Sequence, residues 1–149
     1  MFLAEHELTE LIAWRRELHR RPELSGQEEE TARTVQALLH ATGADKVVAG
    51  LGGHGVLGIY EGGAPGPTIM LRAELDGLPI QETSELAYRS SVPGKAHLCG
   101  HDGHMTILAA VARGLSRQRP KRGRALLLFP AGGRGRLGRG GSPCRCEVR

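Results

Sequence analysis

The strongest constraint on the fold of this 149-residue chain is a short, uninterrupted apolar run in its second half. Residues Arg124–Phe129 follow one arginine with alanine, three leucines and phenylalanine, so no polar residue alternates with the apolar ones. An alternating strand has one face in water, whereas a continuous apolar strand is buried on both faces. The run therefore predicts an inner strand of a sheet, and with it an α/β layered domain.

Helical and strand patterns precede this strand. Apolar residues recur at helical spacing in three segments, which are expected to be helices: 3–20, 26–42 and 103–117. Ser25 and Glu28 have the spacing of a capping box, which would begin the second helix. Three further strands are expected at Val47–Val48, Val56–Tyr60 and Thr68–Arg72, the last two joined as a hairpin-like pair by the turn-rich residues 61–67.

Composition narrows the class of protein and its location. No stretch reaches the length of a membrane span, and residues 1–10 lack the basic-then-apolar order of a signal peptide. Three cysteines, an odd number, do not make a disulfide framework. We therefore expect a protein of the reducing cytoplasm that does not contact a membrane.

The net charge of +4 is distributed unevenly. Basic and acidic residues balance over residues 1–129, whereas residues 130–149 contain five arginines and a single glutamate. The same tail is rich in glycine and holds two of the three cysteines. This abrupt shift predicts a boundary between a folded part, 1–129, and a disordered Gly/Arg-rich tail, 130–149.

The densest group of potential metal ligands lies in residues 97–104, which contain three histidines, one cysteine and one aspartate. Cys99 and His101 are two residues apart, so in an extended segment both side chains point to the same side. A thiolate and an imidazole together suit zinc or another borderline transition metal. The cluster predicts a metal site; the alternative is a polar loop of surface histidines.

A second polar group, Glu74 and Asp76, follows the strand expected at Thr68–Arg72. Carboxylates at such a position often line the mouth of an α/β sheet. Taken alone, the two residues are more typical of solvated loop acids than of functional ones.

Three motifs in order make the chain similar to the aminoacylase and carboxypeptidase superfamily of metallopeptidases, within the branch of hippurate hydrolases, auxin-conjugate amidohydrolases and N-acyl-L-amino-acid amidohydrolases. The matching motifs are Trp14–Ser25, Leu71–Glu82 and His97–Met105. The resemblance runs from about residue 10 to Phe129 and implies an incomplete α/β catalytic domain, with a mixed β-sheet flanked by helices as in zinc peptidases.

The resemblance also implies a function, namely cleavage of the amide bond of N-acyl amino acids by a site with two divalent ions (Zn, Mn, Co or Ni). Carried over residue by residue, Cys99 would be a thiolate ligand shared by the ions and His101 a ligand to one of them. Asp76 would orient a ligand from outside the coordination shell. Glu74 stands where the branch usually has aspartate. Members are often homodimers through a domain that this resemblance does not cover.

One part of the family pattern is missing. After a strand like Arg124–Phe129 the family has Gln-Pro-Ala-Glu-Glu, in which the first glutamate is the general base and the second a metal ligand. Here Pro130 and Ala131 lead into glycine, and no acid occurs between Asp102 and Glu147. The general base is therefore absent, and we expect this chain to be inactive as it stands.

A frameshift at or just before Pro130 would explain the tail. Codons that encode residues 129–148 can be chosen so that, one base out of register, they encode Phe-Gln-Pro-Ala-Glu-Glu. Two alternatives remain. The chain could be a catalytically dead metal-binding fragment, or the Arg-Gly segments of the tail could bind RNA through phosphate electrostatics. Out-of-frame reading of GC-rich codons also produces Arg-Gly runs, so RNA binding is the weaker alternative.

Overall fold

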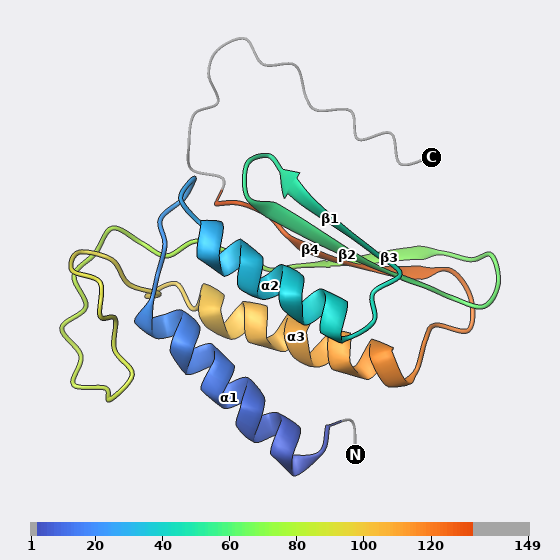
Figure 1. Cartoon of the computed structure of the whole chain (residues 1–149), viewed down its shortest axis with the longest axis horizontal. Helices are drawn as coiled ribbons and strands as arrows, with labels where there is room; N and C mark the ends of the chain where they lie inside the picture. The colour runs from blue at the N-terminus through green and yellow to red at the C-terminus, as the bar shows by residue number, and fades with distance from the viewer. Residues whose placement is uncertain (1–2, 133–149) are drawn as a thin grey trace, which may run out of the picture.

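The structure is a computed structural model that describes residues 3–132. Helices and strands follow one another in the order α1 (Glu5–Arg20), α2 (Glu29–Ala41), β1 (Lys46–Leu51), β2 (Gly55–Glu61), β3 (Thr68–Arg72), α3 (His101–Arg117) and β4 (Arg124–Phe129) (Figure 1). All seven expected elements are present, and the bounds of β3 and β4 agree with the prediction. Disorder was predicted for residues 130–149, and of these residues 133–149 lie outside the part of the chain that the structure describes.

The four strands form one mixed sheet in the order β1-β2-β4-β3. The last strand, β4, lies inside the sheet, antiparallel to β2 and parallel to β3. Leu127 and Phe129 of β4 are completely buried. The prediction of an inner strand and of a mixed sheet is confirmed.

The hairpin predicted between β2 and β3 is wrong, because β4 separates these two strands. The hairpin of the sheet is β1–β2, with Val47 opposite Gly58 and Val48 opposite Leu57. Residues 62–67 instead carry the chain across to the far side of β4, and Gly62 donates its N–H to the carbonyl of Gly123 at 2.7 Å. Such a close approach of two backbones needs glycine, since a Cβ on Gly62 would collide with the Gly123 carbonyl.

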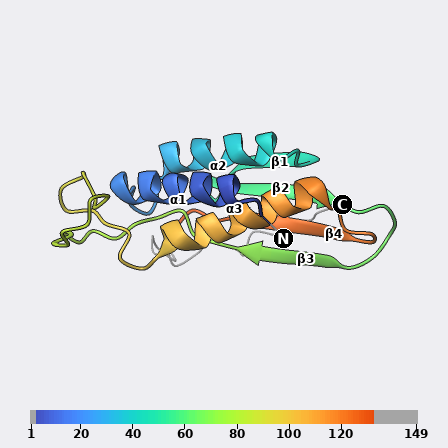
Figure 2. The ribbon, with the colours of Figure 1, turned by 90° about the horizontal axis from the view of Figure 1, so that it is seen from below.

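The three helices lie on one face of the sheet (Figure 1). Figure 2 looks at the molecule from the helical side and shows β3 beyond the area that the helices cover. The core lies between the layers and contains Val35 and Leu39 of α2, Met105 of α3, and Leu127 of β4. Among residues 3–132, no helix is long and apolar enough to cross a membrane.

Strand β3 forms one edge of the sheet and is exposed at all five positions. Its apolar residues Ile69, Met70 and Leu71 are 61%, 52% and 41% exposed. A strand in a parallel pair is ordinarily covered on both faces. The described residues therefore leave an apolar strand without a covering layer.

The capping box predicted at the start of α2 is wrong. Helix α2 begins at Glu29, after an N-cap residue, Glu28, that makes no side-chain capping bond. The Glu23 carboxylate accepts the backbone N–H groups of Glu30, at 3.2 Å, and Thr31, at 2.8 Å. Because Glu23 satisfies these free N–H groups, Ser25 is not required for capping.

Candidate metal centre

His101 and Asp76 lie in direct contact. Nδ1 of His101 is 2.8 Å from the backbone carbonyl oxygen of Asp76 and 3.1 Å from its carboxylate oxygen Oδ1. A carbonyl oxygen can only accept, so Nδ1 of His101 donates and carries the ring proton. In the neutral form of the ring, the other nitrogen, Nε2, therefore has a free lone pair that can bind a metal ion.

The ends of two elements create this contact. Asp76 lies four residues beyond β3. The segment before it is held by hydrogen bonds from the Ala73 N–H to the carbonyl of Leu128 in β4 and from the Leu75 N–H to the carbonyl of Pro130, just after β4. His101 is the first residue of α3, which begins two residues earlier than expected. Gly100 precedes it with φ of 78°, a left-handed conformation that favours glycine. Cys99 lies just before this turn and is an exposed free thiol.

The donors present fit part of a metal site. Cys99 and His101 offer a thiolate and an imidazole, as borderline transition metals prefer. Within residues 3–132, no group of three or more His, Cys, Asp or Glu side chains is placed to hold an ion. Two ligands form a weak site, since catalytic zinc sites usually have three protein ligands. His104 does not complete it; its ring lies beside that of His101, with 6.0 Å between centroids.

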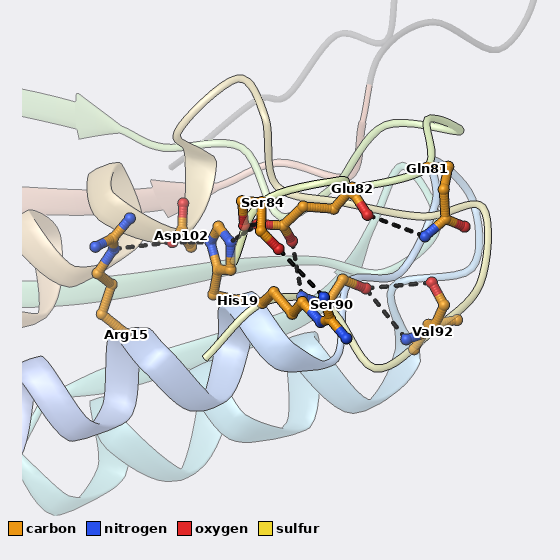
Figure 3. Close-up of polar contacts among 9 residues, drawn as sticks. Arg15, His19, Gln81, Glu82, Ser84, Ser90, Val92 and Asp102 are labelled. Atoms are coloured by element: carbon orange, nitrogen blue, oxygen red, sulfur yellow. Dashed lines mark hydrogen bonds and ion pairs between the residues drawn. The ribbon is translucent and has the colours of Figure 1, made fainter. Parts of the chain in front are cut away.

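Asp102 follows the candidate ligand His101 in the chain and is the centre of a network of polar and charged side chains (Figure 3). Its carboxylate is completely buried, and Oδ2 lies 2.9 Å from both Nε of Arg15 and Nδ1 of His19. The second ring nitrogen of His19 lies 3.3 Å from Oε1 of Glu82. Both ring nitrogens of His19 therefore face carboxylate oxygens, and the ring links Asp102 to Glu82.

Glu82 carries the network into the loop after β3. Burial raises the pKa of Glu82, but hydrogen bonds from the Ser84 hydroxyl, the Ser90 backbone N–H and His19 outweigh burial and lower it below its ordinary value. The carboxylate is therefore ionised near neutral pH. The network joins helix α1, the start of α3 and residues 82–90, which are far apart in the sequence (Figure 3).

His97, two residues before Cys99, is buried. Neither of its ring nitrogens has a hydrogen-bond partner within the described chain, and the same holds for Oδ1 of Asp102. Burial lowers the pKa of His97 to about 4, so the ring is neutral near pH 7. Unpaired buried polar atoms are costly. They are concentrated here, beside the candidate ligands.

The residues of the supposed capping box meet the chain after β4. Oε1 of the completely buried Glu28 accepts the backbone N–H of Gly132 at 2.7 Å. The Ser25 hydroxyl donates to the carbonyl of the same residue. A Cβ at residue 132 would collide with the carboxylate of Asp76. These contacts bring the chain just after β4 next to Asp76.

The structure thus brings Asp76 and His101 together, and Cys99 lies two residues before His101 in the chain. Glu74 pairs with Arg72. Sequence reasoning assigned no role to Arg15, His19 or Glu82. A weak signal existed, because Arg15 and His19 are four residues apart and share one face of α1.

A family model described as peptidase family M20/M25/M40 matches residues 70–132. The chain is 40% identical over 128 residues to N-acyl-L-amino acid amidohydrolase of Geobacillus stearothermophilus, covering 85% of this chain and 34% of that one. It is 41% identical over 125 residues to N-acetyldiaminopimelate deacetylase of Enterococcus faecalis, covering 84% of this chain and 33% of that one.

A solved structure gives the same result. The fold matches a Bacillus subtilis protein described as a dinuclear metal-binding peptidase of the M20 family, with a TM-score of 0.80 and 36% identity. The match covers 86% of this chain and 36% of the other. The chain therefore spans about a third of the length of the relatives it matches. By sequence and by fold, the chain is similar to members of the peptidase family M20/M25/M40 over about a third of their length.

Proposed function

We propose that this chain carries part of the active site of a metal-dependent amidohydrolase that cleaves N-acyl amino acids. The contact between His101 and Asp76 carries the proposal. It leaves Nε2 of His101 as a lone pair, and it is the arrangement in which a carboxylate and a carbonyl fix a metal-binding histidine. The names of the relatives support an amide of an N-acyl amino acid as the substrate.

In this proposal Cys99 and His101 hold the metal, and Asp76 fixes the His101 ring and raises its basicity. When bound, divalent ions polarise the scissile carbonyl and make water a stronger acid. The family resemblance implies two ions, and zinc, manganese, cobalt and nickel all suit the donors. We also propose a cytoplasmic location. The family resemblance further implies a homodimer that forms through a domain outside the region of resemblance.

We further propose that the 149-residue chain is inactive, because no acidic residue follows Asp102 until Glu147. General-base catalysis is typically worth about 10²–10⁴-fold in rate. The frameshift explains this gap, and the nucleotide sequence after the Phe129 codon tests it. The shifted frame should stay open well beyond residue 149 and encode further histidine ligands. A stop codon soon after the glutamate pair would refute the frameshift.

Binding of Co²⁺ tests the metal centre apart from activity. A thiolate bound to Co²⁺ gives a near-ultraviolet charge-transfer band, which Cys99→Ala should abolish. His104→Ala is the matched control, because His104 lies beside His101 and has no assigned role. We expect weak binding, since two ligands are fewer than catalytic zinc sites use, and no hydrolysis of N-acyl amino acids. Chelator-sensitive hydrolysis by the purified chain would contradict the proposed inactivity.

The second candidate is a metal-binding fragment without catalytic function, and the small number of converging donors in residues 3–132 favours it. Restoring the frame separates the two candidates. Tight metal binding together with turnover supports the amidohydrolase. Tight binding without turnover supports the fragment.

A further inference from the structure

Asp102 stands directly after the proposed ligand His101 and is completely buried. A carboxylate out of water requires compensation, and here Arg15 and His19 of α1 provide it, each at 2.9 Å from Oδ2. Residues 15 and 19 lie one helical turn apart, so both reach the same oxygen. These contacts fix the start of α3 against α1 (Figure 3).

We propose that Asp102 is a positioning residue for the metal centre and that its contacts with Arg15 and His19 hold residues 97–101 in the conformation that presents Cys99 and His101 together. The inference rests on the proposed metal centre for its functional meaning. Asp102 touches neither metal nor substrate in this proposal; it acts through the backbone of the segment that it follows. The bond between His19 and Glu82 orders the loop of residues 82–90 and is separable from this role.

Two matched pairs of variants separate positioning from stability. Arg15 and Arg16 both lie over the Tyr88 ring, at 5.6 and 5.1 Å from its centroid, but only Arg15 bonds to Asp102. Arg15→Met therefore removes the contact with Asp102, and Arg16→Met is its control. The Arg15 side chain is 37% exposed, so the fold should tolerate the change.

The second pair is made at His19. The amide nitrogen of asparagine lies close to the position of Nδ1, and that of glutamine close to that of Nε2. His19→Asn keeps a donor toward Asp102 and loses the one toward Glu82, whereas His19→Gln does the reverse. Each variant loses one bond of His19, so urea unfolding should show similar losses of stability.

The first measurement is Co²⁺ affinity by the thiolate band. We expect Arg15→Met and His19→Gln to weaken binding about tenfold or more, as loss of an outer contact does, while Arg16→Met and His19→Asn stay within about twofold. The second measurement needs no metal. It is the hydrogen exchange of the backbone amides of Gly100 and His104, which bond to His97 at 3.3 Å and Gly100 at 3.0 Å.

Exchange of these two amides should accelerate in Arg15→Met and His19→Gln and not in the two controls. If the unmodified chain gives no Co²⁺ band that depends on Cys99, the proposed metal centre fails, and the exchange comparison alone decides the positioning role. The inference is wrong if Arg15→Met matches Arg16→Met, and His19→Gln matches His19→Asn, in both Co²⁺ affinity and amide exchange rate. A loss of affinity that follows only the loss of unfolding free energy overturns it as well.

Discussion

Removing the Asp76 carboxylate tests how the His101 ring is fixed. Two acceptors of Asp76 face Nδ1 of His101, the backbone carbonyl at 2.8 Å and Oδ1 at 3.1 Å. Substitution removes only the longer contact, since the carbonyl belongs to the backbone. Loss of an outer partner typically costs about 10–100-fold in metal affinity, which is about 1.4–2.7 kcal/mol. Because the shorter contact remains, we expect Asp76→Ala to lower the metal affinity about tenfold.

The assay is Co²⁺ titration in competition with a chelator, with Glu85→Ala as the control for loss of one negative charge from an exposed loop position. Asp76→Asn keeps an oxygen that can accept from Nδ1, so its affinity should lie between those of Asp76→Ala and the unmodified chain. A loss well above 100-fold would mean that the carboxylate itself binds the metal. Unchanged affinity in Asp76→Ala would mean that the carbonyl alone fixes the ring.

Three further predictions concern the fold. A hydrogen bond from Arg117 lowers the pKa of Glu7 to about 2; its stabilisation is therefore complete above the ordinary pKa and lost as pH falls toward about 2, so urea unfolding of Glu7→Gln should differ from that of the unmodified chain near pH 7 and converge with it in acid. Leu39 is completely buried, so Leu39→Ala should cost about 2–5 kcal/mol of unfolding free energy, and a loss below 1 kcal/mol in urea titration would contradict the described core. Ile69 is 61% exposed on the edge strand, and an exposed apolar edge strand favours pairing with another chain. We therefore expect self-association in light scattering, which Ile69→Lys should reduce without lowering stability; unchanged association would show that β3 is not the surface of contact.

Local patterns predicted the elements of this fold better than their pairing. The apolar run Arg124–Phe129 identified an inner strand because burial acts on every residue of the run. The order of the strands was missed, because β4 enters between β2 and β3 from more than fifty residues away in the sequence. No local property of residues 61–67 distinguishes a hairpin turn from a crossover.

The candidate site divides in the same way. The Cys99–His101 spacing and the resemblance together identified the proposed ligands, and the motif order identified Asp76. The Asp102 network was not predicted, because His19 and Asp102 are 83 positions apart in the sequence. Ser25 and Glu28 illustrate a different error. Their spacing fits a capping box, yet Glu23 caps the helix, and both residues contact Gly132 instead.

Two carboxylates act on one proposed ligand, His101, by different physical routes. Asp76 acts on the ring, since its oxygens set which nitrogen carries the proton. Asp102 acts on the backbone, since its buried contacts hold the first turn of α3. Its negative charge also lies at the N-terminal end of that helix, where the helix dipole favours it. A ligand whose ring and backbone are fixed separately loses little freedom when it binds an ion, so metal affinity should depend on both acids independently. The losses of metal-binding free energy in Asp76→Ala and Arg15→Met should then add in the double variant. Strong non-additivity would mean that Asp76 and Asp102 do not act on His101 independently.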